Sequence, residues 1–574
     1  MSLARFSSVT FLALLSACQN SPRTQTPQSN PELRRISAAS AINVPSIARP
    51  AEETPQWWFT AGAAAARANA PATPARAKNI IVFLGDGMSF PTVAAARIYA
   101  GQKLGRDGES YRLSFENFPF TALSRTYETD TQTPDSAGTM TAIMSGVKTK
   151  AGFIGVGQLA QHSDCNSARD QQLVSALQLA AVAGQGTGVV STARLTHATP
   201  AATYGHNPNR EWETDAKIPP AEAAKGCTDF ARQLVEFPFG GGLDVALGGG
   251  RSQFMPADQV DPEYANVRGV RTDGKDLVAQ WRAQTSAQYV WNADQFRALD
   301  LAATNKLLGL FEPSHMQYEH DRPSDVGGEP SLAELTRSAI SMLKRHEKGF
   351  FLMVEGGRID HAHHSGNAHR ALVDTVAMSD AVQAALDATD TAETLIVVTA
   401  DHAHTLTFVG YPARGNPILG KVKGGSAGEG PAVDLLGLPY TTLSYANGPG
   451  YQGASNVQAE GVKQYPHLPT TSQALTRPRV DLSQVDTENP NYLQEATLPM
   501  QSETHGGEDV PVYASGPGAA SFHGSLEQNV LFHLMVNSSP ILTAQLCAMQ
   551  SCDENGVPVR LPSLQRLREL QKAQ

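Results

Sequence analysis

The amino-acid sequence predicts an α/β protein with a central, mostly parallel sheet flanked by helices on both faces. Three continuous apolar runs, at 79–84, 349–354 and 394–399, are typical of strands that are covered on both faces. A weaker run follows the same pattern at 187–191, and helical stretches such as 368–386 lie between the runs. Strands that alternate with helices form parallel sheets with helices on both sides.

The first 17 residues have the pattern of a bacterial export signal. Arg5 is the only charge before a short apolar segment, 9–15, which is too short to span a membrane. Leu15-Ser16-Ala17-Cys18 resembles the lipobox of bacterial lipoprotein signals. We expect residues 1–17 to be cleaved off and Cys18 to be a lipid anchor to a bacterial membrane. The predicted location is the cell envelope, on the outer-membrane or periplasmic side; with an ordinary secretory signal, it would be the periplasm.

Residues 18–50 are predicted to be a flexible, lipid-anchored tether, because Ser, Pro, Gln and Asn dominate and no apolar periodicity is present. Thr54 and Pro55 then provide the N-cap and first position of a helix that continues to about Ala70. Trp57 and Trp58 on so short a helix need burial, either in the core or against another subunit.

Residues 51–574 are assigned to one large domain. Within it, 411–498 is expected to be an irregular insertion, since Gly, Pro, Asn and Ser dominate and helical periodicity is poor. The chain has 574 residues, of which 41% are hydrophobic, and a formal net charge of −10. It is therefore long and apolar enough for a sizeable core, and no basic field predicts nucleic acid binding.

Polar side chains follow the three apolar strands at the points where the strands end. Because the carboxyl ends of parallel strands meet in one crevice, we expect these side chains to lie together. So many carboxylates need cations to neutralise them. Imidazole with carboxylate suits Zn²⁺, and carboxylate with hydroxyl and water suits Mg²⁺. The predicted set is Asp86, Glu355, Asp360, His364, Asp401 and His402, with His361, His363 and His404 as neighbours rather than ligands.

Two further segments are weaker signals on their own. Ser136, after Asp135, opens an apparent helix, where free backbone N–H groups favour an alkoxide and an incoming phosphate; a plain capping serine is the alternative. His505 lies among glycines in 504–509.

Four cysteines remain besides Cys18, an even number that suits an oxidising compartment. Four cysteines allow three pairings. Sequence spacing favours Cys547 with Cys552 and Cys165 with Cys227, and a zinc site built from all four is the alternative.

Eight segments together resemble the alkaline phosphatase family, in family order and over about 55–533. VEGGRIDHAHH and THGGEDV are highly specific, and TPDSAGT is moderately so. The segments are FLGDGMS (83–89), TPDSAGT (133–139), LTHATPAATY (195–204), NPNREW (207–212), LLGLFEP (307–313), VEGGRIDHAHH (354–364), TADHAH (399–404) and THGGEDV (504–510).

The resemblance implies an enzyme that hydrolyses small phosphate monoesters through a phosphoserine, with two Zn²⁺ and one Mg²⁺. Ser136 would be the nucleophile, and Arg210, oriented by Asp135, would bind phosphate oxygens. The implied ligands are Asp360, His364 and His505 for one zinc; Asp86, Asp401, His402 and Ser136 for the other; and Asp86, Glu355 and Thr199 for magnesium, with His197 beside that site.

Resemblance to the animal members implies three further features. Glu263, the backbone of Phe311, Glu312 and Glu329 would hold Ca²⁺. The insertion at 411–498 would correspond to the crown of those relatives, and the helix with Trp57 and Trp58 to an arm that reaches a partner in a homodimer. A sulfatase or phosphodiesterase of the same superfamily is the rival, but the sequence around Ser136 lacks the sulfatase context and Arg210 argues against a diesterase.

Overall fold

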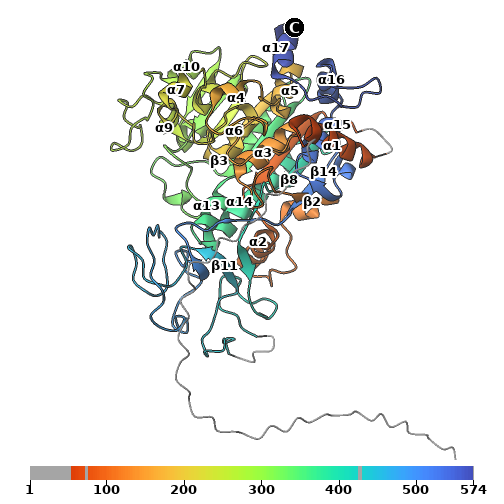
Figure 1. The fold of residues 1–574 in the computed structure, drawn as a ribbon. Coiled ribbons are helices and arrows are strands. Elements are labelled where there is room, and N and C mark those ends of the chain that lie inside the picture. Colours follow the sequence, from red (N-terminus) through yellow and green to blue (C-terminus); the bar gives the residue numbers. More distant parts are fainter. Residues whose placement is uncertain (1–52, 72–74, 425–429, 573–574) are drawn as a thin grey trace, which may run out of the picture. The chain divides into compact units, whose positions relative to one another are not determined.

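The computed structural model describes residues 53–71, 75–424 and 430–572, which belong to one compact unit (Figure 1). The predicted signal, Cys18 and the tether up to residue 50 lie outside the described residues. A ten-stranded sheet forms the centre, in the order β15-β2-β14-β8-β1-β7-β3-β4-β6-β5. The strands are β1 (Asn79–Gly85), β2 (Phe120–Arg125), β3 (Gly186–Arg194), β4 (Val245–Gly249), β5 (Ala287–Val290), β6 (Lys306–Leu310), β7 (Phe350–Gly356), β8 (Thr394–Thr399), β14 (Val510–Ser515) and β15 (Gly524–Glu527).

The predicted, mostly parallel sheet is confirmed. From β8 to β5 each neighbouring pair is parallel, and β1, β7 and β8 are almost completely buried. β14 joins the edge of β8 in antiparallel register, pairing Val512 with Thr399. This mixed edge was not predicted, because β14 follows the last apolar run by more than 100 residues along the chain.

Helices cover both faces of the sheet and separate two large apolar clusters. One cluster packs around α1, α3, α5 and α15, and the other around α2, α12 and α14. The longer helices are α1 (Pro55–Ala68), α2 (Phe90–Lys103), α3 (Ser136–Ser145), α5 (Ala176–Ala183), α12 (Leu332–Leu343), α14 (Ala368–Ala388), α15 (Val530–Ser538), α16 (Pro540–Ala548) and α17 (Leu564–Lys572). The shorter ones are α4 (Cys165–Arg169), α6 (Ala198–Tyr204), α7 (Pro220–Ala223), α8 (Phe230–Val235), α9 (Arg251–Phe254), α10 (Leu277–Arg282), α11 (Ala293–Arg297) and α13 (Arg358–His364).

Helix α1 begins as the sequence predicts, with the Thr54 side chain accepting a hydrogen bond from the Trp57 amide and Pro55 at the first turn. Its inner face packs on α15 of the same chain, where Phe59 lies against Phe532. Trp58 is buried in this core, whereas Trp57 is 39% exposed. The core therefore accounts for one of the two tryptophans.

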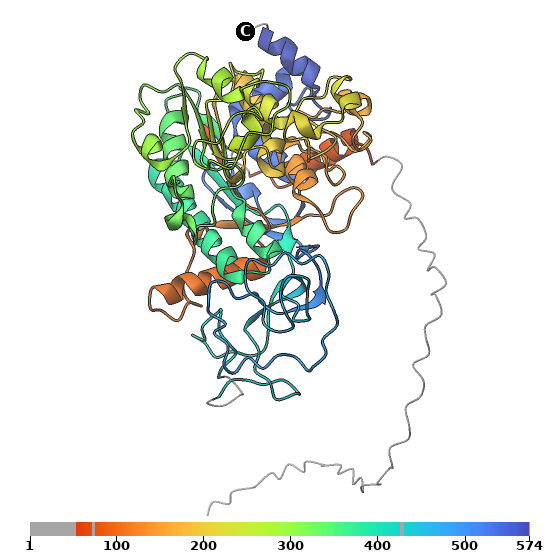
Figure 2. The same cartoon turned by 90° about the vertical axis from the view of Figure 1, so that its left-hand side faces the viewer.

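The region 411–498 is as irregular as predicted and gathers at one end of the unit, beside α2 (Figure 2). Its only extensive ordered pairing among the described residues is a three-stranded sheet of β10 (Leu406–Phe408), β11 (Leu443–Gly448) and β12 (Ala496–Pro499). A two-residue ladder pairs β9 (Ala403–His404) with β13 (His505–Gly506).

The structure contains two disulfides, Cys165 with Cys227 and Cys547 with Cys552, which is the pairing that sequence spacing favoured. The four-cysteine zinc site is therefore wrong. Among the described residues, no single helix combines the length and apolar character of a membrane span. Helices α15 and α16 are long and apolar enough only when they are taken together, and a bend of 110° separates them.

Candidate active site and metal centre

The carboxyl ends of three neighbouring strands deliver the predicted ligands to one place. Asp86 follows β1, Glu355 is the penultimate residue of β7, and Asp401 follows β8. Since β1 pairs with both β7 and β8, these three carboxylates emerge side by side. Helix α13 adds Asp360 and His364, and the β9–β13 ladder brings His505 opposite His404 although 100 residues separate them along the chain.

One cluster contains Asp360, His364 and His505. The Nε2 atoms of His364 and His505 lie 3.1 Å apart and 3.2 and 3.4 Å from the Asp360 Oδ1 atom. The other ring nitrogens are fixed by backbone carbonyls: His505 Nδ1 contacts the Pro134 oxygen, and His364 Nδ1 the Glu503 oxygen. This arrangement turns all three inner donor atoms toward one point, as a metal ion requires.

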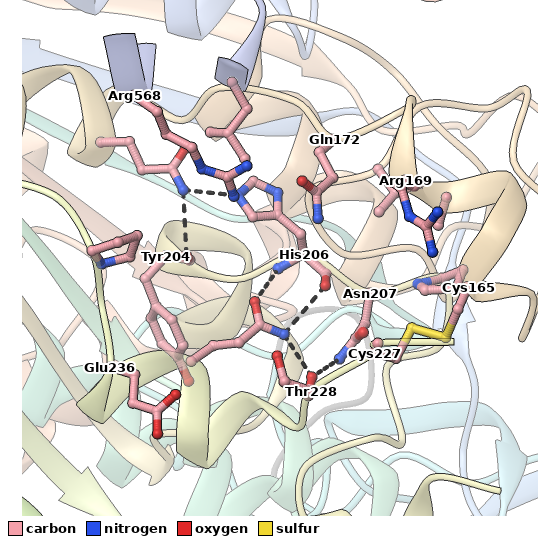
Figure 3. A pocket seen from close by; sticks show the side chains of 18 of the residues that line it. Cys165, Arg169, Gln172, Tyr204, His206, Asn207, Cys227, Thr228, Glu236 and Arg568 are labelled. Carbon is pink, nitrogen blue, oxygen red and sulfur yellow. Dashed lines mark hydrogen bonds between the residues drawn. A yellow bond between two sulfur atoms is a disulfide. The ribbon is translucent and has the colours of Figure 1, made fainter. Parts of the chain in front are cut away.

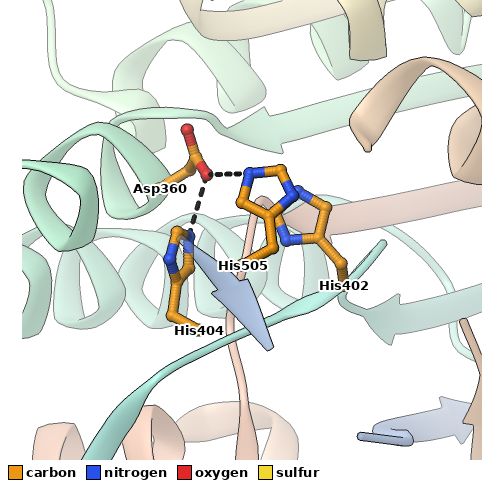
Figure 4. Close-up of side chains that lie close together, drawn as sticks. All are labelled: Asp360, His402, His404 and His505. Atoms are coloured by element: carbon orange, nitrogen blue, oxygen red, sulfur yellow. Dashed lines mark hydrogen bonds and ion pairs between the residues drawn. The ribbon is translucent and has the colours of Figure 1, made fainter. Parts of the chain in front are cut away.

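His404, expected to be a neighbour, lies in the same cluster (Figure 4). Its Nε2 atom is 2.8 Å from the Asp360 Oδ1 atom, and its Nδ1 atom is 2.6 Å from the buried Glu503 carboxylate. Burial works against the charged imidazole, but Glu503 and Asp360 outweigh it and raise the pKa of His404 to about 9. Sequence reasoning missed Glu503, whose only signal is its place directly before the THGGEDV segment.

A second cluster contains Asp86, Asp401 and His402, again as predicted. His402 Nε2 lies 3.2 Å from Asp86 Oδ1 and 3.5 Å from Asp401 Oδ2. Burial, with the charges of neighbouring carboxylates, raises the pKa of Asp86 well above its usual range, and burial lowers the pKa of His402 to about 3. Gly87 has a φ of +65°, and a Cβ atom there would lie 2.2 Å from the His404 ring, so only glycine fits beside the site.

A third group adjoins the second through Asp86 and comprises Asp86, Glu355 and His197. Thr199, in α6 two residues after His197, is fully buried. Ser191, which sequence reasoning missed, donates a hydrogen bond to one Glu355 oxygen and accepts one from the Ala193 amide. Burial raises the pKa of Glu355 to about 8.

Ser136 lies beside these groups at the start of α3. Asp135, not Ser136, is the N-cap: its Oδ1 atom accepts hydrogen bonds from the Ala137 and Gly138 amides. Ser136 is therefore the first helical residue, and its Oγ atom lies 3.1 Å from His402 Nε2. The helix start predicted for this segment is confirmed, and the plain capping serine is wrong.

Arg210 completes this part of the site. Its Nη1 atom donates a hydrogen bond of 2.9 Å to Asp135 Oδ2, and its Nη2 atom lies 3.3 Å from His197 Nε2. Burial works against the Asp135 anion, but Arg210 and the amides of Gly138 and Gly152 hold the pKa of Asp135 at about 2. Arg210 is thus a fixed cation beside Ser136.

Several buried oxygens and one nitrogen at the three groups have no hydrogen-bond partner among the described residues. Buried polar atoms normally have one. Imidazole and carboxylate donors suit Zn²⁺, and a carboxylate–hydroxyl set suits Mg²⁺, so the residues present fit metal ions. The unpartnered atoms are both oxygens of Asp86, Asp401 Oδ2, Glu355 Oε1, Thr199 Oγ1 and His197 Nδ1.

A separate acidic group lies away from the catalytic clusters. Glu263 and Glu312 come together as predicted, and Asp325, which sequence reasoning missed, joins them within 4.8 Å. The Tyr264 hydroxyl donates to Glu312 and Asp325 over 3.1 and 3.3 Å. Burial raises the pKa of Glu312 to about 8. Phe311, directly before Glu312, follows β6. The Glu329 carboxylate accepts a hydrogen bond from the Gln317 amide, and its other oxygen is buried without a hydrogen-bond partner among the described residues. Burial and the charges of Glu312 and Asp325 raise the pKa of Glu329 to about 9, so this carboxylate lies beside the group.

Comparison with known proteins gives concordant results. A family model described as "Alkaline phosphatase" matches residues 77–541. The tissue-nonspecific alkaline phosphatase isozymes of Rattus norvegicus and Gallus gallus are 42% and 43% identical over 473 residues, 81% of this chain and 84% and 85% of the relatives. The alkaline phosphatase of Gadus morhua is 41% identical over 81% of this chain and 92% of its own length.

Solved structures support the same fold. The alkaline phosphatase of Thermus thermophilus aligns with a TM-score of 0.57 at 24% identity, over 89% of this chain and 98% of that structure. The alkaline phosphatase of the Antarctic bacterium TAB5 aligns with a TM-score of 0.52 at 21% identity, over 81% of this chain and 99% of that structure.

Proposed function

The chain belongs to the alkaline phosphatase family and catalyses metal-dependent hydrolysis of phosphate monoesters, and from this premise we propose that Ser136 is the nucleophile of a two-step reaction. The observation that carries the proposal is the position of the Ser136 hydroxyl, 3.1 Å from His402 Nε2 and at the first position of α3. There it lies against a buried carboxylate–imidazole cluster, and the preceding residue, Asp135, holds the Arg210 guanidinium.

In the first step, Ser136 Oγ loses its proton and attacks phosphorus. The bond from phosphorus to the alcohol oxygen breaks on the opposite side, which leaves a phosphoserine and the free alcohol. Arg210 is positioned to bind two of the phosphate oxygens, because the Asp135 carboxylate holds the guanidinium in place. In the second step, water attacks the phosphoserine from the side the alcohol left, releasing inorganic phosphate and restoring the Ser136 hydroxyl.

Two Zn²⁺ and one Mg²⁺ are proposed for the three groups. Asp360, His364 and His505 would hold one Zn²⁺; Asp86, Asp401 and His402, with Ser136, would hold the other; and Asp86, Glu355 and Thr199 would hold Mg²⁺, with His197 beside it. Bound there, the ions would supply Lewis acidity that favours the ionised hydroxyl, activates water and stabilises the leaving oxygen. The support is the set of unpartnered buried atoms at Asp86, Asp401, Glu355, Thr199 and His197.

A Ca²⁺ is proposed for the acidic group of Glu263, Glu312 and Asp325. Three carboxylates within 4.8 Å of one another, with only one arginine paired to them, are short of positive charge. The Asp325 Oδ2 atom is buried and has no hydrogen-bond partner among the described residues. Oxygen-rich sets of this kind suit Ca²⁺.

Export, lipid anchoring at Cys18 and a homodimer are proposed as well. The lipobox-like segment and two disulfides favour an oxidising cell envelope. Trp57, 39% exposed on α1, offers apolar surface to a second copy. A molecular mass equal to one chain at micromolar concentration would contradict the dimer.

The reaction is tested by trapping the intermediate. Enzyme mixed with ³²P-labelled aryl phosphate and quenched in acid should carry label in the peptide that contains Ser136. The Ser136→Ala variant should carry none, whereas Ser145→Ala, at the far end of the same helix, should be labelled like the parent. Label on another residue, or inversion of configuration at a chiral phosphate, would contradict the double displacement.

A further inference from the structure

A polar cavity distinct from the metal-binding groups lies between the Cys165–Cys227 disulfide and α17. It has a volume of about 280 Å³ and is lined by side chains of four segments, which lie within 156–178, 204–208, 225–239 and 564–568 (Figure 3). None of its lining residues belongs to the three metal-binding groups or to the Ser136–Arg210 pair. Leu564 and Arg568 contribute one wall from α17, which lies beyond the residues 77–541 matched by the family.

The walls of this cavity are held in place by bonds that do not depend on a ligand. The disulfide ties Cys165, at the start of α4, to Cys227. The His206 ring contacts Gln178 Nε2 at 2.8 Å on one side and the Gly155 carbonyl at 2.9 Å on the other. Gln233 donates hydrogen bonds to the carbonyl oxygens of Thr228 and His206. The cavity is thus preformed, which lowers the entropic cost of binding.

The cationic side chains of the cavity are not balanced by its one acid. Glu236 is already paired with Arg232 over 2.8 Å, and Lys225 is paired with Glu222 over 2.8 Å and with Asp164 over 3.3 Å. Glu236 is therefore neutralised by Arg232, and the Lys225 ammonium lies between two carboxylates.

Arg169 and Arg568 are different. Arg169 contacts only the Asn166 side chain and the Lys225 carbonyl, and neither arginine joins any ion pair between described residues. Two guanidinium groups that line the cavity therefore have no carboxylate partner among the described residues.

His206 and Gln172 are neutral groups that line the cavity together with the two arginines. Burial lowers the pKa of His206 to about 4, so this ring is uncharged at neutral pH and contributes hydrogen bonding rather than charge. Figure 3 shows Arg568, Gln172 and Arg169 along the same side of the cavity, with His206 close to Arg568. The Gln172 side chain forms no hydrogen bond with another described residue, which leaves its amide available between the two cations.

From this arrangement we propose that the cavity binds a small organic dianion with an anionic group at each end, of the size of a short dicarboxylate. Guanidinium groups bind carboxylates through two parallel N–H···O bonds, and two such groups select two separate anionic ends. A cavity of about 280 Å³ is at the lower end of the range for small-molecule sites, which limits the spacer to a few carbon atoms. Gln172 would hydrogen-bond the middle of such a ligand.

The experiment is isothermal titration of the metal-loaded enzyme with succinate and with glutarate, in the presence of inorganic phosphate at a concentration that saturates the catalytic site. We expect saturable binding of at least one dicarboxylate, and at least tenfold weaker binding of butyrate, which has one anionic end. Arg568→Gln and Arg169→Gln should each weaken dicarboxylate binding by about tenfold or more. Arg566→Gln is the matched control, because Arg566 lies on the same helix, pairs with Glu569 and does not line the cavity.

Hydrolysis of an aryl phosphate should be unchanged in Arg568→Gln, since this arginine is not part of the catalytic site. This readout distinguishes failure of the cavity proposal from failure of the proposed reaction. Absence of saturable binding, equal binding by butyrate, or equal binding in the Arg568→Gln variant would overturn the proposal. Loss of dicarboxylate binding as inorganic phosphate is raised would also overturn it, because the binding would then belong to the catalytic metals.

Discussion

The Asp135 carboxylate joins the nucleophile helix to the phosphate-binding arginine. One oxygen caps α3 through the Ala137 and Gly138 amides, and the other accepts a 2.9 Å hydrogen bond from Arg210 Nη1. A single side chain thereby sets the distance between the group that attacks phosphorus and the group that holds it.

Asp135→Asn should separate these two tasks. The amide oxygen can still cap α3, but the charge that holds Arg210 is lost, so kcat/KM should fall roughly 10- to 100-fold, about 1.5–3 kcal/mol. Steady-state kinetics with an aryl phosphate measure the change. Asp135→Ala also loses the helix cap. Its free energy of unfolding should fall by about 1 kcal/mol, which a lower melting temperature would reveal. Equal activity in Asp135→Asn and the parent would show that Arg210 needs no anchor.

Chelation should remove activity and stability together. The clusters place many buried carboxylates side by side, and without cations their repulsion favours unfolding. A ligand present at 100 times its Kd adds about 2.7 kcal/mol to the free energy of unfolding. Dialysis against a chelator should therefore lower the melting temperature, and Zn²⁺ with Mg²⁺ should restore both properties. Full activity with less than one bound metal ion per chain, measured by mass spectrometry, would contradict the metal assignment.

Calcium should raise the melting temperature of the enzyme without changing its zinc content. Asp325→Asn should abolish this gain, because Asp325 belongs to the acidic group, and Glu329→Gln should reduce it, because the Glu329 carboxylate is buried beside Glu312 and Asp325. Differential scanning calorimetry with and without Ca²⁺ makes the comparison. A gain that survives in both variants would contradict the calcium site.

Lys148 should make the enzyme more stable as the pH rises above 8. Burial lowers the pKa of this lysine from 10.5 to about 8, although the Glu527 carboxylate lies 2.8 Å away. Below pH 8 both the folded and the unfolded chain carry the proton, and the cost of the buried charge is fully present.

Between pH 8 and 10.5 the folded chain releases this proton while the unfolded chain keeps it, so the free energy of unfolding gains about 3 kcal/mol from this group. Urea unfolding of the parent and of Lys148→Met across this range isolates the contribution. The Lys150→Met control should keep the rise, and an identical pH dependence in parent and Lys148→Met would refute it.

Cys18→Ala should release the enzyme from the membrane. Each buried acyl CH₂ contributes about 0.8 kcal/mol to membrane binding, so loss of the lipid removes the anchor. Activity should move from the membrane fraction to the soluble envelope fraction after gentle lysis. An already soluble parent enzyme would disprove the anchor.

Local patterns in the sequence predicted the parts of the site that depend on neighbouring residues. Apolar runs located β1, β7 and β8 to within one or two residues, because a strand buried on both faces leaves a continuous apolar signal. The ligands directly after those strands followed from the same argument. The ligand role of His505 came only from the family resemblance, since its glycine-rich surroundings carry no such signal.

The parts that sequence reasoning missed depend on long-range contacts. Glu503 and His404 meet through the β9–β13 ladder, which no local pattern marks. Asp325, in the loop after β6, joins Glu263 and Glu312 without any motif that marks it as a ligand. Arg568, which forms one wall of the polar cavity, lies beyond the residues 77–541 that the family model matches.

The pairing of His404 with His505 also brings together the two chain segments that flank the irregular region 411–498. The ladder holds the two ends of the region close together, and the cost of closing a loop between fixed ends grows only with the logarithm of its length. The outer loops can therefore vary in length at little entropic cost. Tyr445 hydrogen-bonds His363 and Gln494 hydrogen-bonds the Ala368 amide, so an engineered recognition module placed at this end of the molecule should replace the outer loops and keep these two contacts with the core.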